Sequence, residues 1–430
     1  MSVVAEAQQR TPDADPHAVA LPPRSWRVPV VLAVLSAVTL IAFGVFGSDA
    51  EVRFAWSSIG DPVQLEPWAA DPRLIAIVLG GIAAAVTALA FWLAATRRRV
   101  PIWASLVVGF AFLVSLVAWV GAGGQVPVVF LLTGAIALST PIVFGALAGV
   151  IGERSGIVNI AIEGQLLAGA FASAVVATTT RSFELALIAA MIVGALISMV
   201  LAAFAIKYLV DQVIVGVVLI GLVTAITNFF YSAVLAPNSA QFNSPGTLPK
   251  LRIPLLADIP VLGPVFFDQR LTTYLMFVLV PLTWFVLFKT KWGLRVRALG
   301  EHPLAADTVG IKVNTWRFWS VTIAGLVAGL GGAALTIGSV GAFVREMSAG
   351  QGFIALAAVI LGRWNPFLAA VAALLFGFAS NFRIWATQAG SSLPPDLIAM
   401  TPYVVTILAV AVVAGRVVGP KAAGKPYLKE

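Results

Sequence analysis

Apolar residues in this chain gather in long runs that short polar segments separate. Twelve runs can be traced, at 28–47, 74–95, 102–120, 128–151, 157–178, 184–206, 213–235, 271–288, 318–340, 353–362, 366–387 and 397–415. A helix needs roughly 20 apolar residues to cross a bilayer, and every run except 353–362 approaches that length. The pattern predicts an all-α, polytopic helical membrane protein with about 11–12 transmembrane segments. We expect 353–362 to be either a short span or a re-entrant half-helix surrounded by protein.

Composition agrees with this pattern and narrows the chemistry. The 430 residues are 60% hydrophobic and 11% charged, whereas a soluble domain has about 25% charged residues. The chain has no cysteine, and its two histidines, His17 and His302, lie far apart in sequence. We therefore predict no metal site and no bound cofactor. In a membrane protein, we interpret the net charge of +8 as cytoplasmic anchoring rather than as a nucleic-acid surface.

The distribution of Lys and Arg predicts the orientation of the chain. If the N-terminus lies inside and the runs alternate, 19 of the 27 basic residues fall on inner segments, so both termini should be cytoplasmic. Four regions follow from this arrangement. They are a disordered cytoplasmic tail at 1–27, an N-terminal module of three helices at 28–125, a core at 126–416 with a cytoplasmic loop at 289–317, and a basic cytoplasmic tail at 417–430.

Residues 152–164 interrupt the apolar pattern and read Gly-Glu-Arg-Ser-Gly-Ile-Val-Asn-Ile-Ala-Ile-Glu-Gly. Asn159 and Glu163 are four residues apart, so on a helix they would share one face. A carboxylate at membrane depth is costly and is a functional candidate by default. We expect both side chains on the substrate pathway. The alternative is that Glu163 caps or cross-links helices, through Arg154 or backbone donors. We expect Glu153 and Arg154, at the inner boundary, to fix the helix end.

The loop 289–317 carries a second candidate. Pro303 suits the first turn of a short helix with Glu301 near its positively polarised start, and Gly310 suits its end. Ala305 and Ala306 are small and would let another surface approach closely. We interpret the loop as a docking element. The alternative is a solvated loop whose charges only set the orientation.

This loop resembles the one that ABC-importer permeases insert into their ATPase subunit. Three stretches, residues 152–164, 295–303 and 352–366, resemble the branched-chain amino acid and simple sugar permease family, most of all permeases of bacterial nucleoside importers. The resemblance covers roughly residues 126–416. It implies ATPase contacts on the coupling loop. The residues concerned are Arg297, Glu301, His302, Pro303, Ala305, Ala306 and Gly310.

The resemblance also implies a function and partners. The chain would be the permease subunit of an ATP-driven importer in the bacterial cytoplasmic membrane, a transport subunit rather than an enzyme, with a nucleoside as substrate. It would act with a P-loop ATPase subunit, a second permease subunit, homologous or identical, and an extracytoplasmic substrate-binding protein.

The chain departs from the family in two places. The family places an Asn in the pattern Gly-x-x-Leu-Asn, but here Gly216–Ile220 ends in an apolar Ile220. Asn228 lies two turns further on, and we expect it on the substrate pathway. Residues 1–125 add helices that the family core lacks, and no function follows for them.

One motif matches a phosphate-binding loop by chance. Residues 419–425 read Gly-Pro-Lys-Ala-Ala-Gly-Lys, but Pro426 stands where a Ser or Thr should bind magnesium, and no strand precedes it. We therefore predict no nucleotide site in this chain. Glycines at 145 and 149, at 325 and 329, and at 331 and 332 instead predict close contacts between helices.

Three functional alternatives remain open at this stage. The importer could carry a simple sugar such as ribose, or a branched-chain amino acid. An ion-coupled secondary transporter often has inverted repeats and ion-binding carboxylates, whereas Glu163 is the one clear deep carboxylate in this sequence. A membrane-embedded enzyme ranks last, since the sequence offers no suitably spaced catalytic dyad.

Overall fold

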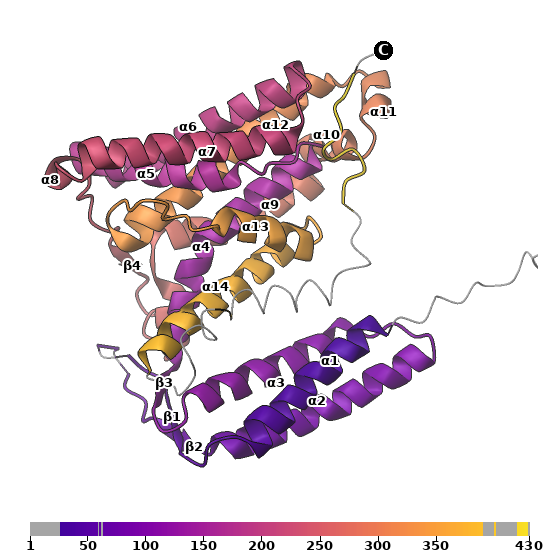
Figure 1. The fold of residues 1–430 in the computed structure, drawn as a ribbon, viewed down its shortest axis with the longest axis vertical. Coiled ribbons are helices and arrows are strands. Elements are labelled where there is room, and N and C mark those ends of the chain that lie inside the picture. Colours follow the sequence, from indigo (N-terminus) through magenta and orange to yellow (C-terminus); the bar gives the residue numbers. More distant parts are fainter. Residues whose placement is uncertain (1–25, 59, 62, 390–399, 401–418, 429–430) are drawn as a thin grey trace, which may run out of the picture. The chain divides into compact units, whose positions relative to one another are not determined.

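The protein, described from a computed structural model, divides into two compact units (Figure 1). The structure describes residues 26–58, 60–61, 63–389, 400 and 419–428. The first unit comprises residues 1–50 and 71–119, and the second comprises residues 51–70 and 120–430. Nearly all of the tail 1–27 and of the predicted run 397–415 lies outside the described residues.

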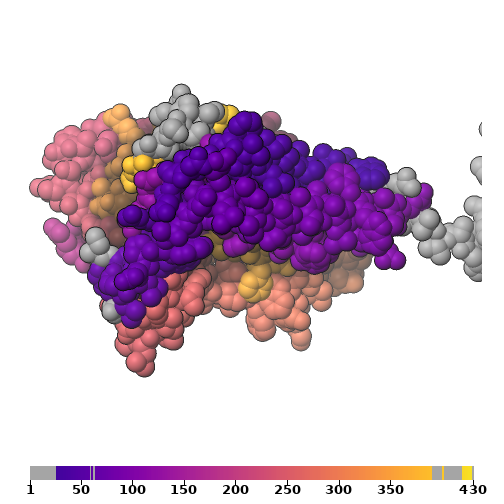
Figure 2. Space-filling view, turned by 90° about the horizontal axis from the view of Figure 1, so that it is seen from below, coloured from indigo at the N-terminus to yellow at the C-terminus, as the bar shows by residue number. Residues whose placement is uncertain are grey.

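The first unit is built from three apolar helices, which Figure 2 shows in indigo to purple. They are α1 (Arg27–Val38), which continues as the π-helical turn η1 (Thr39–Val45), α2 (Pro72–Ala95) and α3 (Ile102–Val120). Small residues such as Ala83, Ala90 and Ala111 are buried between them, and the hydroxyls of Ser36 and Thr87 bond across α1 and α2 at 2.9 Å. Asp71 caps α2, since its carboxylate accepts from the backbone N–H groups of Arg73 and Leu74.

The second unit begins with a short sheet and continues with long helices. Strand β1 (Val52–Ala55) pairs antiparallel with β2 (Trp68–Ala70) and parallel with β3 (Gln125–Pro127). The predicted module 28–125 thus contains a segment, residues 51–70, that belongs to the second unit. The spanning helices of this unit are α4 (Val128–Arg154), α5 (Ile162–Thr180), α6 (Phe183–Ala202) with η2 (Ala203–Lys207), α7 (Gln212–Phe230) with η3 (Tyr231–Leu235), α9 (Leu271–Lys289), α12 (Val313–Leu335) with η5 (Thr336–Val340), and α14 (Pro366–Gln388).

Ten helices of the described residues are long and apolar enough to cross a membrane, which confirms the predicted polytopic helical fold. Helix α13 (Gln351–Leu361) matches the short apolar run. Its 11 residues span roughly 16 Å, about half of a 30 Å hydrocarbon core. This length favours the half-helix.

Glycines bring the central helices of the second unit together. Figure 1 shows α5, α6, α7 and α12 in one group, with α4 crossing to α9, α13 and α14. A Cβ at Gly325 or Gly329 of α12 would collide with the α6 backbone at Gly194 or Ala190, and one at Gly332 would collide with Leu166 of α5. The predicted close contacts are therefore confirmed, and α12 with η5 is the most buried of the described spans.

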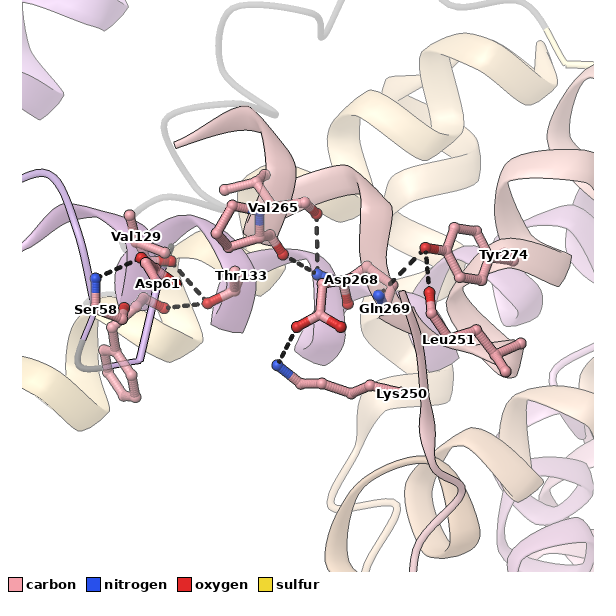
Figure 3. Close-up of polar contacts among 12 residues, drawn as sticks. Ser58, Asp61, Val129, Thr133, Lys250, Leu251, Val265, Asp268, Gln269 and Tyr274 are labelled. Carbon is pink, nitrogen blue, oxygen red and sulfur yellow. Dashed lines mark hydrogen bonds and ion pairs between the residues drawn. The ribbon is translucent and has the colours of Figure 1, made fainter. Parts of the chain in front are cut away.

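The segment between α7 and α9 folds into several shorter elements, which we call the cap. It contains α8 (Ser239–Phe242), the π-helical turn η4 (Gly263–Phe267), and a hairpin of β4 (Lys250–Arg252) and β5 (Asp268–Arg270). Figure 3 shows Lys250 paired with Asp268 at 3.2 Å and the Tyr274 hydroxyl donating to the Leu251 carbonyl at 2.9 Å. These bonds hold the hairpin on the start of α9.

The cap also bonds to the segment that leads into α13. Asn243 donates to the Phe343 carbonyl at 2.9 Å and accepts from the Phe343 N–H at 2.7 Å. Arg270 donates to the Gly338 carbonyl at 2.6 Å, and burial lowers the pKa of its guanidinium. The cap thereby fixes both ends of the turn that follows α12.

Candidate transport and coupling sites

The connection between α4 and α5 runs back along α4 before the next helix begins. Gly156 has a φ of +95°, which reverses the chain with a conformation that favours glycine. Ile162, the first residue of α5, packs against Gly145 and Gly149 of α4. These glycines precede Arg154 by nine and five residues, or roughly 14 and 8 Å along the helix. Helix α5 therefore starts well inside the layer that α4 crosses.

Asn159 lies in this connection and not on α5. Its amide bonds the Gln165 amide in both directions, at 3.1 and 3.2 Å, and Gln165 donates onward to the Ser198 hydroxyl of α6 at 2.9 Å. The prediction that Asn159 and Glu163 share a helix face is wrong, because α5 begins only at Ile162. Asn159 is buried in a closed amide network that ties the connection to α5 and α6.

Glu163 lies in the first turn of α5 and holds the start of α13. One carboxylate oxygen accepts from the Gly350 N–H at 2.8 Å, and the other accepts from the Gly352 N–H at 2.6 Å. A Cβ at Gly352 would collide with the Glu163 backbone. Two helix starts thus meet at one carboxylate, and a negative charge is favourable at each of them. This arrangement matches the capping alternative with backbone donors, while a solute contact at Glu163 stays a prediction.

Asn228 lies on α7, near the segment 341–350 that precedes α13. Its amide nitrogen donates to the Glu346 carboxylate at 3.1 Å, whereas its buried carbonyl oxygen has no hydrogen-bond partner among the described residues. Ile220 lies two turns earlier, against Gly164. Segment 341–350 therefore contacts two of the predicted residues, Asn228 through Glu346 and Glu163 through Gly350. Asn159 lies in a separate network.

The sequence alone did not identify several polar residues of this region as part of the site. Gln165 and Ser198 complete the Asn159 network, and Gln212 at the start of α7 accepts from the Val158 N–H at 2.7 Å. Their signal was present, since each is a polar residue in or beside an apolar run. What the sequence lacked was any indication that they meet.

The C-terminal end of α4 is fixed by the turn between α13 and α14. The Trp364 indole donates to the Glu153 carboxylate at 2.5 Å, and the Arg154 guanidinium donates to the Trp364 carbonyl at 3.2 Å. Arg154 and Arg297 both lie over the Phe288 ring, at 5.5 and 5.0 Å. The prediction that Glu153 and Arg154 fix this helix end is confirmed.

The predicted docking loop folds into two helices, α10 (Lys291–Glu301) and α11 (Pro303–Thr308). Pro303 occupies the first turn of α11, as expected, with Glu301 and His302 directly before it. Gly310, with a φ of +84°, follows the end of α11, and its N–H donates to the Asp307 carbonyl at 2.8 Å.

The two alanines of α11 face opposite ways. Ala306 is buried with Leu299, Val313 and Tyr427. Ala305 is exposed, and beside it Leu304 and Val309 are 57% and 75% exposed. These three residues form the exposed apolar face of α11. Because only Ala305 faces outward, the expectation of two small residues at the surface is wrong for Ala306.

Helix α10 lies directly on the end of α4. A Cβ at Gly300 would collide with the Arg154 carbonyl oxygen, so glycine is required for this approach. Arg297, one turn earlier, packs on Phe288 as described above. Helix α10 thus connects α11 to the residues just before the α4–α5 connection.

Comparison with known proteins identifies the family of this chain. A family model described as the branched-chain amino acid transport system permease component matches residues 131–413. The guanosine ABC transporter permease NupQ of Bacillus subtilis is 43% identical, over 68% of this chain and 94% of NupQ. The nucleoside ABC transporter permease NupC of Lactococcus lactis is 38% identical, over 68% and 94%. The glucose ABC transporter permease TsgB13 of Haloferax volcanii is 30% identical, over 65% and 80%.

No solved structure matches the chain significantly. The matched residues lie in the second unit and leave α1, α2 and α3 outside the family model. The family model covers well over half of the chain, and NupQ is matched over nearly its whole length. The chain is therefore a multi-pass membrane protein that belongs to the family of branched-chain amino acid transport system permease components, the permease subunits of ABC transporters.

Proposed function

We propose that this chain is one permease subunit of an ATP-driven nucleoside importer in a bacterial cytoplasmic membrane. The observation that carries the proposal is the 43% identity to a guanosine permease over 94% of its length. NupC, named as a nucleoside permease, supports the same substrate class. A sugar is the alternative, since TsgB13 is named as a glucose permease, but its identity is lower, at 30%.

The second permease subunit is expected to be homologous rather than identical. Two permeases of Bacillus subtilis, NupQ and NupP, carry the name of a guanosine transporter, and the chain is 43% identical to the first and 29% to the second. We infer that it takes the place of NupQ in such a pair and needs a NupP-like partner. A P-loop ATPase and an extracytoplasmic binding protein complete the importer.

The exposed apolar face of α11 fits the ATPase contact. Leu304, Ala305 and Val309 present apolar surface in a cytoplasmic segment that is otherwise cationic. Closure of the ATPase pair on ATP would push on this face. The push would pass through Gly300 to Arg154, and then through the α4–α5 connection to Glu163 and the start of α13. Import then requires two global states, which ATP and the loaded binding protein favour differently.

The segment 341–350 is the best candidate for the substrate pathway. It carries Glu346 beside Asn228, whose carbonyl oxygen is unpartnered among the described residues. An amide and a carboxylate can hydrogen-bond ribose hydroxyls and base edges. Asn159 fits this role less well, because the amides of Asn159 and Gln165 satisfy each other.

Uptake of labelled guanosine, uridine and adenosine, with ribose, glucose and leucine as comparisons, tests the proposal in cells with and without this gene. We expect deletion to abolish nucleoside uptake alone, and depletion of ATP to abolish nucleoside uptake in cells that keep the gene. Loss of ribose or glucose uptake instead would assign the sugar alternative. Uptake that follows an ion gradient and ignores ATP would overturn the importer mechanism.

A further inference from the structure

The C-terminal segment 419–428 lies across the cytoplasmic elements of the second unit. This is the segment whose sequence matches a phosphate-binding loop by chance. Its Ala422 N–H donates to the Gly300 carbonyl of α10 at 2.8 Å, and its Gly424 N–H donates to the Gly156 carbonyl of the α4–α5 connection at 3.2 Å. The segment therefore bonds both to α10 and to the α4–α5 connection that leads to Glu163.

Glycines make this docking possible at two points. Gly424 has a φ of +76°, a conformation that other residues rarely adopt, and it lies at the bond to Gly156. Gly419 packs on the Trp364 ring, where a Cβ would lie 2.8 Å from a ring carbon. Because Trp364 also bonds Glu153, the segment reaches the turn between α13 and α14 as well.

Arg317 joins the same elements from inside. It is 1% exposed, on the first turns of α12. Its guanidinium donates to the Leu299 carbonyl of α10 at 3.3 Å and to the Lys425 carbonyl of the C-terminal segment at 3.1 Å. Gly156 packs directly on the guanidinium. Because a buried cation needs hydrogen-bond acceptors, these two carbonyl bonds hold Leu299 of α10 and Lys425 of the C-terminal segment in fixed positions on α12.

An apolar contact completes the docking. Tyr427 is 8% exposed and packs with Leu299 of α10, Ala306 of α11 and Val313 of α12. Ala306 is the buried alanine of α11, directly beside the outward-facing Ala305. The segment thus supports α11 from behind while leaving its exposed face open.

We propose that residues 419–428 are a strap that holds α10, α11 and the α4–α5 connection together as one unit, with Arg317 as its positioning residue. A displacement of α11 then moves the α4–α5 connection by nearly the same amount. The strap thereby couples ATP hydrolysis to transport. This inference rests on the proposed function, since it assigns the strap a role in that importer. The strap stays docked through the cycle and does not act as a switch.

The first test removes residues 419–430 and measures the reconstituted importer, with its ATPase and both permeases. We expect the complex to assemble and hydrolyse ATP, while nucleoside imported per ATP falls about tenfold. A truncated chain that keeps the wild-type ratio of import to hydrolysis would overturn the proposal.

Point substitutions separate positioning from folding. Arg317→Gln should lower nucleoside imported per ATP as truncation does, and Arg317→Lys, which keeps a cation but fewer donors, should restore part of it. Lys421→Gln is the matched control, because Lys421 is exposed on the same strap and should leave the ratio unchanged. If Arg317→Gln lowers the amount of folded protein but leaves the ratio unchanged, Arg317 is structural only and the proposal fails.

A cross-link tests docking without relying on transport. The chain has no native cysteine, so a pair introduced by Val313→Cys and Tyr427→Cys can be oxidised selectively. We expect the cross-link to form in purified protein, and oxidation to leave uptake at the level of the same double variant kept reduced, because the strap stays docked. A pair that does not cross-link, or a cross-link that stops uptake, would overturn the proposal. Since formation of the bond needs no solute, failure of the nucleoside assignment would leave this result standing.

Discussion

The two short helices α13 and α11 differ in how the backbone N–H groups of their first turns are satisfied. At the start of α13, the Glu163 carboxylate accepts from two backbone N–H groups, and Gly352 lets the two chains touch. At the start of α11, no side chain caps the helix, and the neighbouring His302 and Leu304 are exposed. In a bilayer a backbone donor must be satisfied within the protein, whereas at a cytoplasmic surface water or a partner can do so. Substitutions should therefore break the fold at α13 and break coupling at α11.

The largest effect is expected at Glu163. Glu163→Leu leaves the Gly350 and Gly352 N–H groups without an acceptor, at a cost of about 1–3 kcal/mol for each buried donor. We expect a large loss of folded protein in membranes and a lowered Tm in detergent, and with them the loss of uptake. Thermal unfolding of the purified chain measures the effect.

Two further variants show whether the loss of uptake comes from lost stability or from a lost contact with solute. Glu184→Gln is the control, because Glu184 also lies in the first turn of a helix but is exposed, so its Tm should stay near that of the wild type. Glu163→Gln keeps one acceptor oxygen and should lie between the two. If Glu163→Gln is as stable as the wild type and yet imports no nucleoside, the carboxylate contacts solute, and the comparison between the two helix starts is wrong.

The second effect is a contrast within α11 itself. Ala305→Trp adds bulk to the exposed face, so we expect normal insertion and Tm but no uptake, because the ATPase can no longer approach. Ala306→Trp forces bulk into the contact with Leu299, Val313 and Tyr427, and overpacking of this kind costs about 1–3 kcal/mol or more. Co-purification of the ATPase, together with the Tm, distinguishes the two. Equal effects from both variants would mean that α11 has no open face.

The sequence predicted those parts of the fold that depend on local chemistry. Apolar runs located the spans, the glycine pairs located the contacts of α12, and Pro303 and Gly310 located the two ends of α11. It did not predict where α5 begins, because Ile157 and Ile160 are apolar whether they lie in a helix or in an extended connection. The partners of Glu163 were equally hidden. The Gly350 N–H lies 187 residues away, and only the fold brings the two together.

The third effect is expected at Asn228 and concerns substrate rather than stability. Asn228→Leu removes an amide whose carbonyl oxygen is unpartnered among the described residues and which bonds only Glu346 there. We expect the Tm to change little and the KM for nucleoside uptake to rise about tenfold, as for a lost hydrogen bond to solute of about 1.4 kcal/mol. Asn238→Ala, on an exposed amide bonded to the Val234 carbonyl, is the control. An unchanged KM would remove Asn228 from the substrate pathway.

The smallest effect is expected at Gly310, where the comparison is sharpest. The site is open, with no atom within 4 Å of an added Cβ, but its φ of +84° makes alanine cost about 1–2 kcal/mol. Gly246→Ala in the cap between α7 and α9 carries the same kind of strain, since its φ is +71° and its surroundings are also open. The two variants should lose similar stability by thermal unfolding, yet Gly310→Ala alone should lower import per ATP. Because strain is matched, a difference in coupling can come only from position. Equal import per ATP in both variants would show that coupling does not depend on a fixed C-terminal end of α11. The contacts behind the exposed face of α11 would then be enough to keep the helix in position.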